Sequence, residues 1–266
     1  MGRRTLTYNS PMSSLFDVSG KVVLVTGGTS GIGEMIARGF LDAGAVVLVA
    51  SRKADVGEAL TEELSKKGSF TFIQANLSTE AECRRLADVV ATITDHLDIL
   101  VNNAGATWGA PMDDYDEAAF ERVLSLNVKG VFHLTKFLRP LLEARASADA
   151  PSRVINIGSV DGLRVPVMET YAYSASKAAV HQLTRHLAKF LAPTITVNAI
   201  APGPFESRMM HATIQAVGDD IVRAAPMKRL GQPSDMAGTA IFLASPAASY
   251  ITGAVIPVDG GLATLS

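Results

Sequence analysis

The chain has 266 residues, of which 48% are hydrophobic and 19% are charged. This composition can bury a large core, so it argues against a disordered protein, and the length fits one large α/β domain. The formal net charge of −2 lacks the basic footprint that nucleic-acid binding normally leaves. The single cysteine, Cys83, excludes an intramolecular disulfide and fits a reducing, cytoplasmic setting.

The first residues, MGRRTLTYNSPMSS, are polar and basic and lack the apolar run of a signal peptide. Residues 1–17 are therefore expected to form a loose tail ahead of one domain over 18–266. No stretch is apolar enough to cross a bilayer without Gly, Pro or charged interruptions, so we expect no membrane contact. The five histidines are scattered and no carboxylate cluster accompanies them, so we expect no metal site.

Seven short apolar runs alternate with longer amphipathic stretches along the chain. The runs are KVVLVTGG, AVVLVAS, FTFIQAN, DILVNNAG, RVINIGS, ITVNAIAPG and AVIPVDGG. They are apolar throughout, as strands are when both faces of their sheet are covered. The alternation predicts a single-domain, Rossmann-type, doubly wound parallel α/β sheet of about seven strands with helices on both faces. The two longest helices are predicted over about 115–145 and 173–191.

A glycine-rich segment, TGGTSGIG at residues 26–33, follows the first strand and opens the first helix. Glycine lets the backbone approach a pyrophosphate closely and turn sharply. The free N–H groups at a helix N-terminus then favour the negative charge. A plain strand-to-helix turn is the alternative for such a loop taken alone. We expect the first half of the domain to bind a dinucleotide through Gly27, Thr29, Ser30, Gly31, Ile32 and Gly33.

Further motifs follow in order: NNAG at 102–105, Asn127 in LNV, Ser159 in NIGS, YSASK at 173–177, and PG at 202–203. With the glycine loop and ITGAVIPVDGG near the end, they resemble the short-chain dehydrogenase/reductase family from about residue 18 onward. Within it the chain is similar to 3-oxoacyl-carrier-protein reductases. The resemblance implies hydride transfer between a nicotinamide and a carbonyl or alcohol. It adds cofactor contacts at Asn76, Leu77, Asn103, Ala104, Gly105, Tyr173, Lys177, Pro202 and Gly203.

The resemblance also implies a catalytic set, in which Tyr173 is the acid/base. Ser159 would hold the substrate oxygen, Lys177 would bond the nicotinamide ribose, and Asn127 would support a water that links Lys177 to solvent. Tyr173 and Lys177 are four residues apart on one helix face, so the cation is expected to lower the tyrosine pKa from about 10. Tyr171 has Ala175 at the equivalent position, so it has no paired lysine. The Ser159-to-Tyr173 gap is one residue longer than is usual in the family. Taken singly, Ser159 fits a turn or helix cap, and Asn127 a satisfied helix amide.

The end of the second strand bears on the choice of cofactor. An NAD site usually places an acid there, whereas this chain has Ser51 followed by Arg52. Arg52 is able to pair with a 2′-phosphate, which favours NADP(H) and leaves NAD(H) possible. A solvated basic pair with Lys53 is the alternative. Asn76 is expected to accept a hydrogen bond from the adenine amino group.

Substrate and assembly follow from the resemblance and from a few side chains. A 3-oxoacyl thioester on acyl carrier protein or coenzyme A is the favoured substrate. A sugar, polyol or steroid alcohol dehydrogenase and a catalytically silent nucleotide sensor are the alternatives, and the intact Ser, Tyr and Lys disfavour the sensor. Segment 204–230 is expected to be a mobile lid. The substrate site would include Thr107, Trp108, Gly109, Arg164, Arg208, Met209 and Met210. A homotetramer is expected through the two long helices, which carry Val131, Phe132, Leu134, Phe137, Leu183, Leu187 and Phe190.

Overall fold

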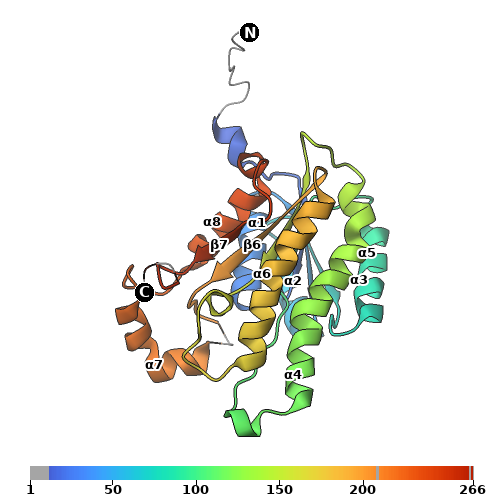
Figure 1. Ribbon diagram of the computed structural model, residues 1–266. Helices are drawn as coiled ribbons and strands as arrows, with labels where there is room; N and C mark the ends of the chain where they lie inside the picture. Colours follow the sequence, from blue (N-terminus) through green and yellow to red (C-terminus); the bar gives the residue numbers. More distant parts are fainter. Residues whose placement is uncertain (1–11, 208–209, 264, 266) are drawn as a thin grey trace, which may run out of the picture.

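The computed structural model describes residues 12–207, 210–263 and 265. Seven strands form one sheet in the order β3-β2-β1-β4-β5-β6-β7, and every neighbouring pair is parallel (Figure 1). The strands are β1 (Val22–Thr26), β2 (Val46–Ser51), β3 (Phe70–Gln74), β4 (Ile99–Asn102), β5 (Ser152–Ile157), β6 (Ile195–Pro202) and β7 (Val255–Val258). The predicted doubly wound parallel sheet is confirmed.

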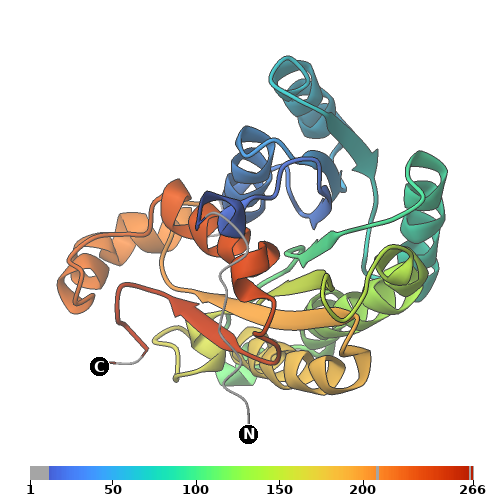
Figure 2. The same ribbon diagram turned by 90° about the horizontal axis from the view of Figure 1, so that it is seen from above.

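Helices cover both faces of this sheet (Figure 2). One face packs against α1 (Gly31–Asp42), α2 (Ala54–Leu64) and α8 (Pro233–Ala244); the other packs against α3 (Glu80–Ile93), α5 (Val131–Glu143) and α6 (Tyr171–Leu191). Successive β1 side chains alternate between the two cores: Val23 and Val25 point to the first, Val22 and Leu24 to the second. Side chains of a strand point alternately to its two faces, so a strand that is covered on both faces needs an unbroken apolar run.

The long helix predicted over 115–145 is continuous but changes its pitch in the middle. It consists of α4 (Glu117–Leu124), a π-helical turn η3 (Ser125–Gly130) and α5. A Cβ on Gly130 would lie 2.7 Å from the Leu77 carbonyl oxygen, so only glycine fits where this turn meets the loop after β3. Such wide turns are common at functional sites, and this one carries the buried Asn127.

The segment predicted as a lid follows β6, and its two ends pair with each other. Phe205 and Gly231 form a parallel bridge, and Gly231 N–H donates to the Pro204 carbonyl at 3.0 Å. Between them lies α7 (His211–Ala224), which is kinked at Val217. The joined ends suit a lid, whose mobility stays a prediction. Arg208 and Met209 lie outside the described residues.

The described chain begins with a short 3-10 helix, η1 (Met12–Phe16), where the sequence predicted a loose tail to residue 17. The Phe16 ring lies 6.4 Å from that of Phe242 on α8, and this contact brings order to the chain before residue 18. Residues 1–11 lie outside the described part. The remaining short turns are η2 (Met112–Asp114), η4 (Val160–Gly162) and η5 (Pro246–Ala248).

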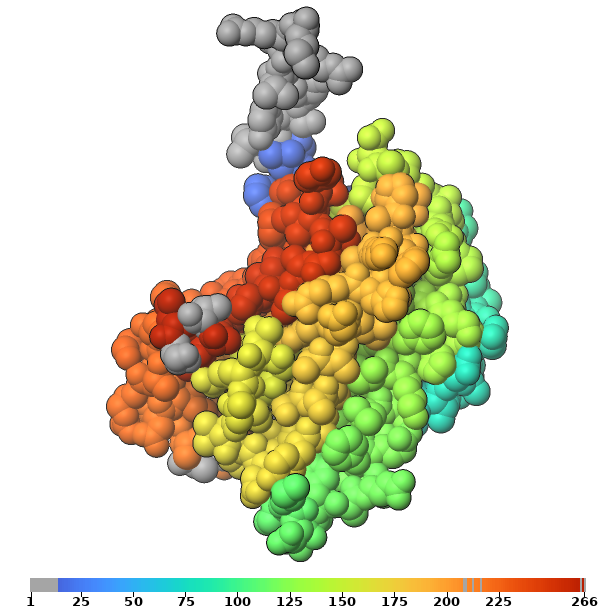
Figure 3. All heavy atoms as spheres, viewed as in Figure 1, coloured from blue at the N-terminus to red at the C-terminus, as the bar shows by residue number. Residues whose placement is uncertain are grey.

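The outer faces of α5 and α6 lie side by side on one side of the molecule (Figure 3). Phe132 and Phe190 are exposed there. Val131 and Leu134, expected at the same surface, are buried within the fold because their helix positions turn them inward. The uncovered apolar area is therefore narrower than the sequence suggested.

No helix in the described part of the chain is both long and apolar enough to span a membrane. Within the same ranges, no group of three or more His, Cys, Asp or Glu side chains is arranged to hold a metal ion.

A glycine contact between α1 and α8 leads to a stability prediction. A Cβ on Gly39 would lie 2.4 Å from the Cβ of Ala237. Overpacking of this kind costs about 1–3 kcal/mol and should outweigh the helix-propensity gain of about 1 kcal/mol. Gly39→Ala is therefore expected to lower the free energy of unfolding measured in urea. Gly238→Ala on α8 is the matched control, because a Cβ there meets nothing within 4 Å. It should raise that free energy slightly, and equal effects of the two changes would contradict this packing.

Candidate active site

The predicted site residues converge at the carboxyl edge of the sheet. β1 pairs with β2 on one side and with β4 on the other. The chain adds β2 and β3 on one side of β1 and then β4 to β7 on the other side, so the order of strand addition reverses between β1 and β4. In open α/β sheets, ligands bind in the crevice outside the strand ends at this switch point. The glycine loop follows β1 and NNAG follows β4, so the two loops are neighbours there.

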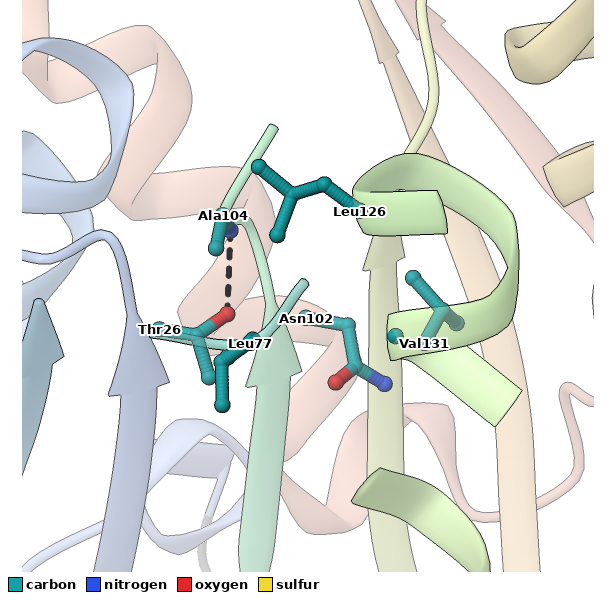
Figure 4. A pocket seen from close by; sticks show the side chains of 7 residues that line it. Thr26, Leu77, Asn102, Ala104, Leu126 and Val131 are labelled. Atoms are coloured by element: carbon teal, nitrogen blue, oxygen red, sulfur yellow. Dashed lines mark hydrogen bonds between the residues drawn. The ribbon is translucent and has the colours of Figure 1, made fainter. Parts of the chain in front are cut away.

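One hydroxyl, that of Thr26, ties these two loops together. Its Oγ1 accepts a hydrogen bond from the backbone N–H of Ala104 at 2.9 Å (Figure 4). It also accepts one from the backbone N–H of Asn103 at 2.9 Å. The Asn103 side chain donates back to the Thr26 carbonyl at 2.8 Å. A cavity of about 10 Å³ beside Thr26 and Ala104 has room for at most one water. The sequence analysis missed Thr26, although it opens the TGG motif.

The glycine loop has the backbone geometry that a dinucleotide pyrophosphate requires. Gly27 and Gly31 have φ values of +65° and +55°, which only glycine adopts readily. A Cβ on Gly33 would lie 2.3 Å from the Asn103 side-chain nitrogen. Ser30 precedes α1 without capping it through its side chain, so the first helical N–H groups are open to an anion. These residues therefore fit the phosphates of a nicotinamide dinucleotide, with Thr29 and Ile32 in the same turn.

The end of β2 presents a free cation beside this loop. The Thr29 hydroxyl donates to the Ser51 hydroxyl at 2.9 Å, which joins the glycine loop to β2. Arg52 is exposed, and its guanidinium makes no hydrogen bond or ion pair with any residue that the structure describes. An unpaired guanidinium in this place suits a ribose 2′-phosphate.

The adenine contact expected of Asn76 stays a prediction. Its side-chain oxygen already accepts from the Ser78 hydroxyl at 3.0 Å and has a second lone pair for an adenine amino group. The adjacent Leu77 is buried. At the far side, Gly203 N–H donates to the Val258 carbonyl at 2.9 Å, and a Cβ there would lie 2.7 Å from the Asp259 Cα. Pro202 and Gly203 thus lie at the carboxyl end of β6, held against β7.

Tyr173 lies in the first turn of α6, close to the Ser159 side chain. Burial raises the pKa of Tyr173 to about 12; the hydrogen bond with Ser159 opposes the rise, and the charge of Asp161 adds to it. Ser159 also caps η4, because its hydroxyl accepts from Asp161 N–H at 3.1 Å. The cap that the sequence offered as an alternative for Ser159 thus coexists with the contact to Tyr173. Asp161 itself was not singled out in the sequence, although it stands two residues after Ser159.

Lys177 lies one turn further along α6 and is buried. Its Nζ donates to the Ile157 carbonyl at 2.8 Å and lies 5.5 Å from the centroid of the Tyr173 ring. Burial lowers the pKa of Lys177 to about 8. The expectation that Lys177 lowers the pKa of Tyr173 is not met here, because loss of solvent around the phenol dominates. A protonated tyrosine is the form that can give a proton to an alkoxide.

Asn127 reaches the same place from the π-helical turn. Its side-chain oxygen accepts from Ala106 N–H at 2.8 Å, and its nitrogen donates to the Ala106 carbonyl and the Ser176 hydroxyl, both at 2.9 Å. A Cβ on Gly105 would lie 3.3 Å from the Asn127 oxygen and 3.8 Å from Lys177 Nζ. The Asn127 amide therefore holds the loop after β4 close to Lys177. Its support of a water stays a prediction.

His181 continues the inward face of α6 beneath the Ser159 turn. It is 2% exposed, and a Cβ on Gly158 would lie 2.1 Å from its Nε2. Burial lowers the pKa of His181 to about 4, helped by the charges of Lys177 and Arg185 and opposed by the Gly162 backbone. The ring is therefore neutral at physiological pH. The sequence analysis set His181 aside as one of the scattered histidines.

Comparisons with known proteins extend over nearly the whole chain. Residues 27–263 match the model of a family described as enoyl-(acyl carrier protein) reductase. The rhamnolipids biosynthesis 3-oxoacyl-[acyl-carrier-protein] reductase of Pseudomonas aeruginosa is 48% identical over 254 residues, which make up 94% of this chain and 99% of that protein. The 7alpha-hydroxysteroid dehydrogenase of Escherichia coli is 35% identical and is aligned over 92% of this chain and 94% of its own length. A solved structure, the Pseudomonas aeruginosa RhlG/NADP active-site complex, has a TM-score of 0.91 and 47% identity, covering 95% of this chain and 100% of that one.

The buried His181 leads to a pH-dependent stability prediction. An unfolded histidine takes up a proton near its ordinary pKa of about 6.5, whereas the folded His181 stays neutral down to about pH 4. Stability is therefore lost as the pH falls below 6.5. Between pH 7 and pH 5 this group should lower the free energy of unfolding by about 2 kcal/mol. His181→Leu should lack that loss in urea titrations at the two pH values, whereas the exposed control His186→Leu should retain it. Parallel pH dependence of wild type and His181→Leu would refute the assignment.

Proposed function

The chain belongs to the short-chain dehydrogenase/reductase family of oxidoreductases, and we propose that it catalyses the NADPH-dependent reduction of a 3-oxoacyl thioester. The observation that carries the proposal is that Tyr173 lies close to the Ser159 side chain and beside the buried Lys177, whose Nζ is 5.5 Å from the centroid of the Tyr173 ring. This arrangement provides two hydroxyls for one substrate oxygen. It lies at the strand ends next to the glycine loop.

The chain's own groups account for the proton side of the reaction. Bound NADPH supplies the hydride. Ser159 donates a hydrogen bond to the carbonyl oxygen and stabilises the charge that develops there. Tyr173, whose pKa is raised to about 12, holds its proton until the alkoxide takes it. Lys177, with a pKa of about 8, is largely charged at neutral pH and favours the phenolate left behind. Asn127 keeps the loop after β4 in place.

Support for an acyl substrate comes from likeness and from exposed apolar side chains. The 48% identical relative is named as a 3-oxoacyl-[acyl-carrier-protein] reductase. Trp108, after NNAG, and Leu163 and Met168, after β5, are exposed around the strand ends. These exposed apolar side chains suit an acyl chain. Arg164 keeps its charge, but its Nη1 donates to the Leu262 carbonyl at 3.4 Å, so a single arginine with one donor already used makes no basic patch for an acidic carrier protein. Coenzyme A and acyl carrier protein both stay open as carriers.

A steroid, sugar or polyol alcohol dehydrogenase is the second candidate. The likeness to a 7alpha-hydroxysteroid dehydrogenase supports it. So does Asp161, whose carboxylate near Tyr173 is able to accept from a substrate hydroxyl. A silent nucleotide sensor is disfavoured because Ser159, Tyr173 and Lys177 are all retained.

We also propose a cytoplasmic, homotetrameric protein, assembled through the uncovered faces of α5 and α6. Light scattering at micromolar concentration tests the assembly.

The experiment that tests the proposed function is steady-state reduction of acetoacetyl-CoA and of a longer 3-oxoacyl thioester, each with NADPH and with NADH. We expect turnover of both thioesters and a preference for NADPH. If both thioesters are inert while a steroid, sugar or polyol ketone is reduced, the second candidate replaces the first. Cofactor binding without turnover of any carbonyl would favour the sensor.

Replacement of the proposed acid tests the mechanism directly. Tyr173→Phe should lower kcat by about 10²–10⁴-fold, because general acid–base catalysis is commonly worth that much. The dissociation constant of NADPH, read from nicotinamide fluorescence, should stay within a factor of two. Activity within twofold of wild type would remove Tyr173 from the mechanism and direct attention to Tyr171.

Cofactor preference is expected to depend on the free guanidinium after β2. Arg52→Asp should raise kcat/KM with NADH relative to NADPH by at least tenfold, since the new carboxylate repels a 2′-phosphate and accepts from a ribose hydroxyl. Lys53→Asp introduces the same charge one residue further on and should shift the ratio less. Equal catalytic efficiency of the wild type with both cofactors would contradict the role of Arg52.

A further inference from the structure

A hydroxyl from a distant segment caps the helix that carries the proposed catalytic tyrosine. The first N–H groups of a helix have no partner within it. Thr170, at the N-cap of α6, does not supply one through its side chain, because its hydroxyl donates to the Met168 carbonyl at 3.3 Å. The Ala172 N–H instead donates to the hydroxyl of Tyr115 at 3.2 Å. Tyr115 follows the loop after β4.

The same hydroxyl also holds the segment that follows NNAG. Tyr115 donates its own proton to the Trp108 carbonyl at 3.2 Å, so it acts as acceptor for α6 and donor for this segment. A second backbone bond runs alongside, from Ala110 N–H to the Glu169 carbonyl at 3.2 Å. The segment 106–110 and the start of α6 are therefore joined at two points.

Aromatic packing keeps the Tyr115 hydroxyl aimed at these partners. The Tyr115 ring meets Tyr171 edge-on at a centroid distance of 5.5 Å and Phe120 at 6.0 Å. The Tyr171 hydroxyl, by contrast, bonds only the Glu169 carboxylate, at 2.8 Å. Of the two tyrosine hydroxyls in this cluster, only that of Tyr115 accepts a hydrogen bond from the backbone of α6.

We propose that Tyr115 is a positioning residue that acts through α6. Its hydroxyl holds the first turn of α6 and the segment 106–110 in one geometry, and so aims the Tyr173 hydroxyl at a substrate lying against that segment. This inference rests on the proposed function, in which Tyr173 is the proton donor. Displacements well below 1 Å matter in proton transfer, because a 1 Å misplacement can lower a rate by about 10²-fold.

The test is Tyr115→Phe, which removes the hydroxyl and keeps the ring. We expect kcat to fall about tenfold while the NADPH dissociation constant stays within twofold. The solvent deuterium isotope effect on kcat should rise, because proton transfer from a displaced Tyr173 becomes slower. Amide hydrogen exchange of a peptide spanning 168–176 should become faster as the Ala172 N–H loses its partner.

Tyr171→Phe is the matched control within the same cluster. It should leave kcat and the isotope effect within experimental error of the wild type. An equal loss in both variants, or a fall in kcat with an unchanged isotope effect, would assign the effect to general packing and overturn the inference. Unchanged exchange in Tyr115→Phe would overturn it as well, even with the proposed function intact. If Tyr173→Phe keeps its activity, the role of Tyr173 as proton donor fails, and exchange alone reports whether Tyr115 holds α6.

Discussion

The hydroxyl of Thr26 is the interaction on which the site depends. It lies at the end of β1 and receives the backbone N–H groups of Asn103 and Ala104 from the end of β4. Both bonds are shielded from water, since Thr26 is 1% exposed. An unmade hydrogen bond in such a place costs about 1–3 kcal/mol, so the two loops are held together strongly. The open N–H groups at the start of α1 and the segment that Asn127 anchors both take their positions from this junction.

The inward face of α6 carries buried ionisable groups that lower the stability of the fold. Tyr173, Lys177 and His181 lie on consecutive turns. Burial favours the neutral form of each side chain, because it raises the pKa of the tyrosine and lowers the pKa of the lysine and of the histidine. Groups of this kind destabilise a fold compared with apolar side chains. Ionisable groups with displaced pKa values are typical of functional sites, which agrees with the roles proposed for Tyr173 and Lys177. The apolar cores on both faces of the sheet offset this cost.

Sequence-based reasoning worked where a pattern has one physical meaning. Unbroken apolar runs such as VVLV predicted strands covered on both faces, and Val22–Val25 alternate between two cores as that requires. The spacing of Tyr173 and Lys177 placed both on one helix face. It failed for the pKa of Tyr173, because spacing carries no information about solvent. Spacing also gave no sign that the Asn76 side-chain oxygen accepts a hydrogen bond from the Ser78 hydroxyl.

The sequence by itself determined the fold class, the glycine loop and the order of the proposed catalytic residues, because periodicity and backbone requirements are local properties of the chain. Only the tertiary structure decided which groups assist them. Tyr115 stands far from Ala172 in the chain, and Asn127 far from Ala106 and Ser176, yet each pair is hydrogen-bonded. Such contacts depend on how α4, the π-helical turn and α6 pack together. No local sequence pattern predicts that packing, because it results from the burial of apolar side chains throughout both cores.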